Sequence, residues 1–222
     1  MRFVRKGPEP ESLREFKAMA NPPDWLPTYD GLPQKRKSVI KMALIEEQGG
    51  LCCYCECILR ERDSHIEHLK PQHPYEELAL DYGNMLCSCL SDVEKGDPLH
   101  CGMAKGDWYD ERLLISPLDP DCGTHFKFLG DGSIVPVDAS DDAAVATIAH
   151  LRLDDKELTA KRKAVIDSFL DDCLTDDDRE RFLNDYLTER ASSPSEFISA
   201  VRSVLLPTSN SKLGIDENEK DC

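Results

Sequence analysis

The fold is decided by residues 49–57, which read Gly-Gly-Leu-Cys-Cys-Tyr-Cys-Glu-Cys. Cys52 and Cys55 form a Cys-x-x-Cys pair, a spacing at which two thiolates can bind one tetrahedral Zn²⁺. A second pair, Cys89 and Cys101, follows farther along the chain. The spacing therefore predicts a structural Zn²⁺ with four cysteine ligands and no open position for catalysis. The alternative is that these are buried free cysteines, which pack as small apolar side chains.

The cysteine content and the first residues indicate the cellular compartment. The chain has 10 cysteines in 222 residues, and seven of them lie between positions 52 and 101. Such clustering favours metal binding over a disulfide framework, which is also rare in a reducing cytosol. The first residues, Met-Arg-Phe-Val-Arg-Lys-Gly-Pro, lack the apolar run of a signal peptide, and no stretch approaches the ~20 apolar residues of a membrane helix. We therefore expect a cytoplasmic protein that does not contact a membrane.

Between the two cysteine pairs lie residues that suit phosphodiester hydrolysis. The segment His65-Ile-Glu-His-Leu-Lys-Pro71 comes first, and Asp81-Tyr-Gly-Asn84 follows. Hydrolysis needs a base for water, and the neutral imidazole of His68 has a suitable pKa. It also needs a divalent cation, and the Glu67 carboxylate suits Mg²⁺ or Mn²⁺. Asn84 would fix the loop or orient the imidazole.

These assignments have simpler alternatives. Neighbours on a regular strand point to opposite faces, so residues 67 and 68 must sit at a strand end or bend, which Pro71 favours. Asn84 follows Gly83 and could be an ordinary turn residue. His65 and His73 are interpreted as solvated polar side chains rather than as catalytic groups.

The remaining pattern predicts an α+β architecture. Helices are expected over residues 10–19, 35–48, 141–151, 155–174, 176–190 and 194–205. Short extended segments are expected over 57–62, 65–69 and 113–138, the last with a hairpin turn at Gly130-Asp-Gly132. The predicted regions are an N-terminal helical segment (1–50), a metal-bound core with the hairpin (51–140), a helical C-terminal region (141–206) and a flexible tail (207–222).

At the cysteine and histidine segments the chain resembles the HNH endonucleases of the Septu and retron-associated antiphage systems, the PtuB-like family. The matching segments are Glu47-Gln-Gly-Gly-Leu-Cys-Cys-Tyr-Cys-Glu56, Ile66-Glu-His-Leu-Lys-Pro-Gln72, Tyr82-Gly-Asn-Met-Leu-Cys-Ser-Cys89 and His100-Cys-Gly-Met-Ala-Lys-Gly-Asp107. The resemblance implies a ββα-metal core held by structural zinc. It also implies an endonuclease that works with an ATPase of the ABC or SMC type, the PtuA-like partner, on a nucleic-acid substrate.

One position departs from the pattern of HNH sites. Such sites ordinarily end in Cys-His-x-x-Lys, where the histidine binds the catalytic metal. Here the text is Cys-Gly-Met-Ala-Lys, so Gly102 stands at the position of that ligand. If the segment is helical, His100 and Asp107 share a face, and either could complete the metal site. Asp107 is favoured slightly, because an oxygen ligand suits Mg²⁺.

The charge of the chain bears on its partners. The formal net charge is −16, with +4 over residues 1–42 and −13 over residues 43–153. A protein that binds nucleic acid by itself normally has a basic face, because phosphate contacts supply much of the affinity. We therefore expect the ATPase partner to hold the substrate. Two other hypotheses stay open: a non-catalytic zinc-knuckle subunit that bridges an ATPase to nucleic acid or protein, and a zinc hydrolase, which the four-thiolate site disfavours.

Overall fold

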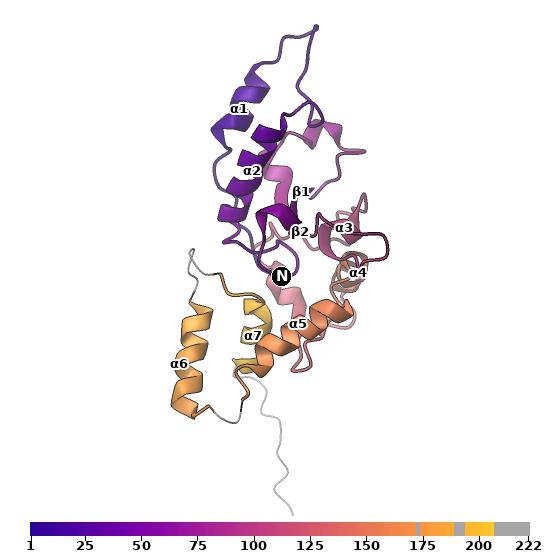
Figure 1. Ribbon diagram of the computed structural model, residues 1–222. Coiled ribbons are helices and arrows are strands. Elements are labelled where there is room, and N and C mark those ends of the chain that lie inside the picture. Colours follow the sequence, from indigo (N-terminus) through magenta and orange to yellow (C-terminus); the bar gives the residue numbers. More distant parts are fainter. Residues whose placement is uncertain (172–173, 189–193, 207–222) are drawn as a thin grey trace, which may run out of the picture.

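The computed structural model describes residues 1–171, 174–188 and 194–206 and shows a mixed α+β chain (Figure 1). Two N-terminal helices precede a small central sheet, and helices dominate the C-terminal part, as the sequence predicts. The elements in chain order are α1 (Glu11–Ala18), α2 (Gln34–Glu47), β1 (Ser64–His68), β2 (Met85–Cys89), α3 (Cys101–Lys105), β3 (Phe126–Phe128), β4 (Ile134–Pro136), α4 (Asp142–Leu151), α5 (Lys156–Asp167), α6 (Asp176–Leu187) and α7 (Ile198–Leu205).

Helix α2 leads the chain into the cysteine-rich segment. It begins after Pro33, whose fixed φ suits the start of a helix, and it buries Ile40 and Leu44. Gly49 and Gly50 follow with φ values of 65° and 78°, a left-handed conformation that glycine adopts without steric cost. The double glycine therefore ends the helix where the sequence predicts and turns the chain toward Cys52.

The described residues form two separate two-stranded sheets. Strands β1 and β2 are antiparallel, and Glu67 lies opposite Leu86 while His68 lies opposite Met85. Strands β3 and β4 form the predicted hairpin with Gly130-Asp-Gly132 in its turn. Helix α3 contacts β2 on one side and α4 on the other, so β1, β2 and α3 form one unit at the centre of the molecule.

Four predicted segments differ from the structure. Residues 61–62, predicted as the end of the extended segment 57–62, lie in a 3₁₀-helical turn (Glu61–Asp63). Residues 113–118 form turns rather than strand, and α5 ends at Asp167 instead of extending to 174. Helix α7 begins at Ile198, not at 194, because the backbone N–H groups of Phe197 and Ser199 donate to Glu56. A distant contact, invisible in the local sequence, thus sets the start of this helix. The predicted tail, 207–222, lies outside the described residues.

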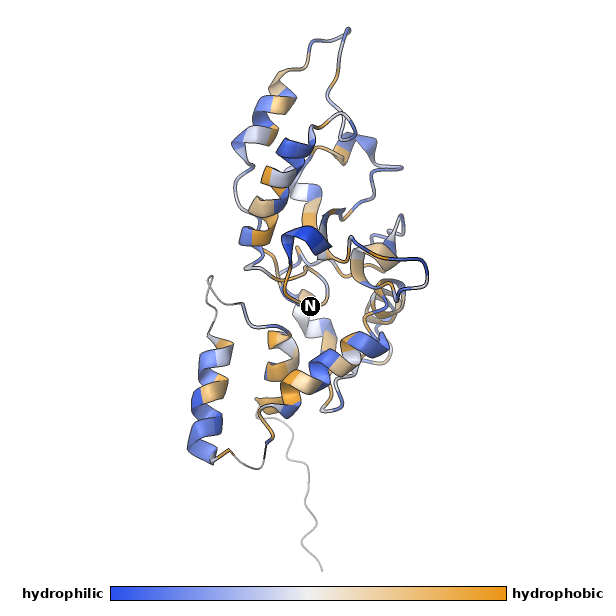
Figure 2. Ribbon diagram, viewed as in Figure 1, coloured by the Kyte–Doolittle hydropathy of each residue, from blue (hydrophilic) through white to orange (hydrophobic). Residues whose placement is uncertain are grey.

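The main hydrophobic core draws on the N-terminal, central and C-terminal parts of the chain. Leu44, Tyr54, Met85, Leu151 and Leu158 belong to it, and each is at most 1% exposed. A second, smaller cluster joins the end of α5 to α6 and α7 through Phe169, Leu183 and Val201. Figure 2 shows α6 as largely hydrophilic, which fits its single buried residue, Leu183. No helix among the described residues combines the length and the apolar character needed to cross a membrane.

Candidate metal centre and active site

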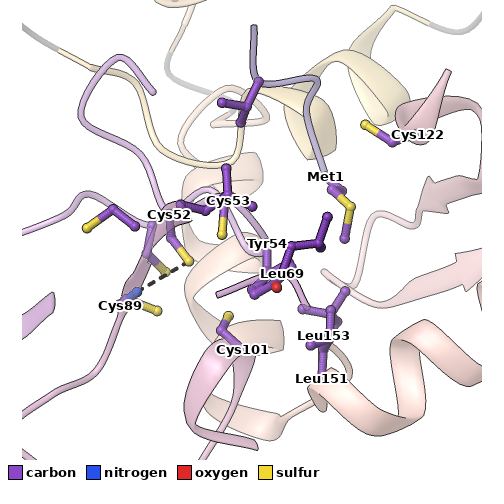
Figure 3. Packing of buried hydrophobic residues seen from close by; sticks show 14 of the residues in the cluster. Met1, Cys52, Cys53, Tyr54, Leu69, Cys89, Cys101, Cys122, Leu151 and Leu153 are labelled. Atoms are coloured by element: carbon purple, nitrogen blue, oxygen red, sulfur yellow. Dashed lines mark hydrogen bonds between the residues drawn. The ribbon is translucent and has the colours of Figure 1, made fainter. Parts of the chain in front are cut away.

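The two predicted cysteine pairs meet in space. The sulfur atoms of Cys52, Cys55, Cys89 and Cys101 all lie within 4.8 Å of one another, and those of Cys55 and Cys89 are 3.6 Å apart. Four sulfurs about 2.3 Å from one tetrahedral ion would be about 3.8 Å apart, close to this spacing. The quartet could therefore hold a structural metal ion such as Zn²⁺. Figure 3 shows three of these cysteines close together, while Cys122 lies apart.

Three elements bring the four sulfurs together. Cys52 and Cys55 lie in the turn after α2, Cys89 ends β2, and Cys101 begins α3. The backbone N–H of Cys89 donates to the sulfur of Cys52 over 3.4 Å, and that of Cys57 donates to the sulfur of Cys55 over 3.5 Å. Such amides stabilise negative charge on thiolates. The quartet therefore joins the turn, the sheet and the helix.

Glu67 lies in a buried polar cluster on one face of β1. Its side chain is only 7% exposed, and one oxygen, Oε1, accepts from Tyr54 Oη at 3.1 Å and pairs with Lys105 Nζ at 2.9 Å. The other oxygen, Oε2, lies 3.4 Å from His65 Nε2. Burial alone would raise the pKa of Glu67, but the hydrogen bond from His65 and the charge of Lys105 lower it. Glu67 is therefore a carboxylate.

His68 is the last residue of β1, and its ring contacts the loop that follows the strand. Its Nε2 lies 3.0 Å from the carbonyl oxygen of Ala79, and its Nδ1 lies 3.4 Å from the amide nitrogen of Gln72. A carbonyl can only accept, so Nε2 carries the proton and Nδ1 keeps its lone pair. The ring of Tyr29 covers the imidazole edge-on at 4.6 Å. Burial lowers the pKa of His68, which favours the neutral form that a general base needs.

Asn84 holds the loop between β1 and β2. Its Oδ1 accepts from the backbone N–H of Lys70 at 2.8 Å, and its Nδ2 donates to the carbonyls of Lys70 at 2.9 Å and Leu78 at 3.3 Å. Leu78 precedes Ala79, whose carbonyl contacts His68. Asn84 therefore acts on His68 indirectly. It binds the backbone of Leu78, and the carbonyl of the next residue, Ala79, holds the imidazole.

Comparison with known proteins gives two curated relatives. Over 103 residues, 45% of this chain and 48% of the relative, it is 33% identical to "Retron Vc95 putative HNH endonuclease" of Vibrio cholerae serotype O1 biovar El Tor. Over 55 residues, 24% of this chain and 21% of the relative, it is 40% identical to "Septu protein PtuB" of Bacillus thuringiensis. The matched stretches are thus similar to a putative HNH endonuclease of a retron and to a Septu protein. No family model matches the chain.

The relationship covers only part of each protein. The matched stretch spans about half the length of the retron endonuclease and about a fifth of the Septu protein, as the shares of 48% and 21% show. It agrees with the resemblance carried by the HNH segments of the sequence. Because only part of each relative is matched, the activity, substrate and partners of this chain are proposed rather than taken from the relatives.

His100 and Asp107, the two residues expected to complete the HNH metal site, lie outside the Glu67 cluster. The Nδ1 of His100 is 3.1 Å from the sulfur of Cys101 and 3.8 Å from that of Cys89, so His100 belongs to the surroundings of the cysteine quartet. Asp107 is exposed beyond the end of α3. Among the described residues, no hydrogen bond or ion pair joins Glu67 to either of them.

His65 and Lys105 are the members of the Glu67 cluster that the sequence analysis did not assign. His65 lies two residues before Glu67, and the period-two alternation of a strand puts both on one face, a signal that the motif-based analysis did not use. Burial would lower the pKa of His65, but its hydrogen bond to Glu67 raises it. His73, grouped with His65 in the sequence analysis, is exposed.

Proposed function

We propose that this chain is a metal-dependent HNH endonuclease that hydrolyses phosphodiester bonds of nucleic acid in antiphage defence. The observation that carries the proposal is the pair formed by Glu67 and His68 at the end of β1. The Glu67 carboxylate is buried and ionised, and the imidazole at the last residue of the strand keeps Nδ1 available as a base. The name of the retron relative, an HNH endonuclease, supports the same activity.

The arrangement around this pair fits a ββα-metal core. Strands β1 and β2 pair in antiparallel fashion, and α3 packs against β2. A structural Zn²⁺ on the cysteine quartet would join the end of β2 to the start of α3, because Cys89 and Cys101 belong to both the quartet and these elements. The zinc would thereby fix α3, and with it Lys105, relative to Glu67.

His68 would begin the reaction by taking a proton from water. The water oxygen then attacks phosphorus, the bond from phosphorus to the leaving oxygen breaks, and a proton from solvent reaches the leaving group. Gln72 and the Ala79 carbonyl orient the imidazole, and Asn84 keeps the Ala79 region in place. A Mg²⁺ or Mn²⁺ ion held by Glu67, when bound, neutralises charge on the phosphate and the leaving oxygen. Lys105 stabilises Glu67 as a carboxylate.

An ATPase partner would bind the nucleic-acid substrate. The net charge of −16 opposes binding of a polyanion by the isolated chain, and the name of the Septu relative suggests a PtuA-like partner. Helix α2 is the main exception, because it carries Lys35, Arg36, Lys37 and Lys41 close to β1. We propose that the partner holds the nucleic acid and delivers it near this basic helix.

A second candidate function is a non-catalytic bridging subunit. Two observations favour it: Gly102 replaces the final histidine of ordinary HNH sites, and the His68 residue is only 6% exposed. In this case the quartet would still bind zinc, and the chain would link an ATPase to nucleic acid or protein without cutting.

The two functions are separated by one activity measurement. The chain is co-expressed with its genomic neighbour, as wild type, His68→Ala and the exposed-histidine control His73→Ala. Plasmid DNA and total tRNA are offered with Mg²⁺ or Mn²⁺, and bound zinc is counted in each sample. We expect cleavage by wild type and His73→Ala and a loss of about 10²- to 10⁴-fold in His68→Ala, with zinc retained. Cleavage that is absent from all three, or equal in all three, would refute the nuclease proposal.

A further inference from the structure

We propose that His65 is a ligand of the catalytic ion and takes the place of the helix histidine that Gly102 lacks. This inference rests on the proposed nuclease function and names a residue of its metal site. It replaces His100 and Asp107 as the second ligand beside Glu67. Four features support it: the direction of the imidazole, the spacing of the two donor atoms, the space at Gly102, and the exposure of His65 to solvent.

The imidazole of His65 is held in the form that binds a metal. Its Nδ1 lies 2.8 Å from the carbonyl oxygen of Leu90, which can only accept, so the proton is on Nδ1. Nε2 faces Oε2 of Glu67 across 3.4 Å; without an ion it can donate a proton to that oxygen, and a cation bound between the two atoms would displace that proton and take up the lone pair. Metal-binding histidines commonly donate their second N–H to a carbonyl or carboxylate in this way.

The two facing atoms are spaced as donors to a single ion. Two ligand atoms about 2.1 Å from one cation, at roughly a right angle, are about 3 Å apart. The 3.4 Å between His65 Nε2 and Glu67 Oε2 needs only a small adjustment. The other Glu67 oxygen is occupied by Tyr54 and Lys105, so Oε2 is the oxygen left for the ion.

Gly102 provides the space that this arrangement needs. A Cβ atom at Gly102 would lie 2.5 Å from Glu67 Oε2 and 2.6 Å from His65 Nε2, closer than such contacts occur. The helix cannot easily retreat, because the backbone N–H of Gly102 donates to Ser88 Oγ at 3.0 Å. An imidazole from position 65 and a side chain at position 102 therefore exclude each other. Gly102 therefore makes room for His65 as the ligand, and its presence does not mean that the metal site has been lost.

Substrate and water can reach this pair. The side chain of His65 is 24% exposed, whereas that of Glu67 is 7% exposed. His65 also lines a cavity of about 180 Å³ together with Lys37, Lys41 and Ser64. The two lysines favour a phosphate in this cavity beside His65, although Glu67 is not among the residues that line it.

The test measures Mn²⁺ on the zinc-loaded full chain, so that it does not depend on activity. Wild type, His65→Ala and the control His73→Ala are titrated with Mn²⁺ by calorimetry, and pulsed EPR detects nitrogen bonded to the bound ion. We expect at least a tenfold weaker Mn²⁺ affinity and loss of the nitrogen coupling in His65→Ala only. If His65→Ala binds Mn²⁺ as tightly as wild type, the inference is wrong, whether or not a nitrogen signal is seen. His65 is then only an ion-pair partner of Glu67.

A second variant tests the space argument. Gly102→Ala would push His65 away from Glu67 and should also weaken Mn²⁺ binding, whereas Gly130→Ala should not, because nothing lies within 4 Å of its added Cβ. Wild-type Mn²⁺ affinity in a folded, zinc-loaded Gly102→Ala protein would contradict the inference. The proposed function fails separately, if His68→Ala cleaves nucleic acid as well as wild type whatever the Mn²⁺ result.

Discussion

The cysteine quartet and the Glu67 cluster both adjoin the first turn of α3, and they differ in how many metal ligands the protein supplies. The quartet has four donor atoms of one kind within 4.8 Å, and protein atoms alone could fill the coordination sphere of Zn²⁺. The Glu67 cluster offers Oε2 and the His65 Nε2, while Lys105 neutralises the carboxylate. A site that holds the fold can be closed by the protein, whereas a site that reacts must leave positions for water and substrate.

The two clusters are also linked through adjacent residues. Cys101 belongs to the quartet, Gly102 borders Glu67, and Lys105 reaches Glu67 from the next turn of the same helix. An ion on the quartet would therefore position the second cluster. The first prediction removes this link. The later ones leave the quartet intact and change the Lys105 partner of Glu67, the loop beside His68, or the end of α3.

The largest effect is expected from Cys101→Ala. Structural zinc contributes about 10–16 kcal/mol of binding free energy in small zinc domains, so loss of one ligand should unfold the central unit. The control is Cys122→Ala, because Cys122 is equally buried, at 0% exposed, but lies outside the quartet. Zinc counting and circular dichroism should show loss of zinc and structure in Cys101→Ala only. Full zinc content and a wild-type melting curve for Cys101→Ala would show that the quartet is a set of packed free cysteines.

The sequence predicts correctly those features whose signal lies within a few adjacent residues. The Cys-x-x-Cys pair, the double glycine after α2 and the hairpin at Gly130–Gly132 each occupy a few adjacent residues, and the structure contains all three features. The start of α7 was misplaced because Glu56, far away in the chain, fixes it. His65 was interpreted as surface because its role depends on a space that only the packing of α3 reveals.

The next largest effect is expected from Lys105→Met. The side chain of Lys105 is 1% exposed and pairs with Glu67, so its removal leaves the buried carboxylate with only Tyr54 and His65 as partners and no ammonium group beside it. Breaking a buried pair in this way typically costs about 3–5 kcal/mol. Saturating Mn²⁺ should restore part of that loss, because a bound cation replaces the missing positive charge.

Urea unfolding with and without Mn²⁺ measures both parts of this prediction. The control is Lys163→Met, because the Lys163 pair with Asp167 is about half exposed and should contribute under about 1 kcal/mol. A loss in Lys105→Met that Mn²⁺ does not reduce would mean that no ion binds beside Glu67.

A smaller effect is expected from Asn84→Asp, which keeps the shape of the side chain. The carboxylate can still accept from Lys70 N–H but cannot donate to the carbonyls of Lys70 and Leu78, which should cost about 1–3 kcal/mol. Because the Ala79 region would loosen, cleavage should fall while bound zinc stays constant. Faster hydrogen exchange of the loop amides, absent from the exposed control Asn184→Asp, checks this. Slow exchange with lost activity would instead place Asn84 in direct contact with the reacting groups.

The smallest effect is expected from Asp107→Ala, and it sharpens the assignment of the second cluster. Asp107 is exposed and makes no described hydrogen bond or ion pair with Glu67, so its removal should change Mn²⁺ affinity and cleavage by less than about twofold, within the range of an ordinary surface substitution. His65→Ala, measured in the same titration, should weaken Mn²⁺ binding at least tenfold. The reverse order of the two variants would mean that the end of α3 moves toward Glu67 when the ion binds. The ion would then be held by an oxygen from the helix side, and His65 would serve only to balance the charge of Glu67.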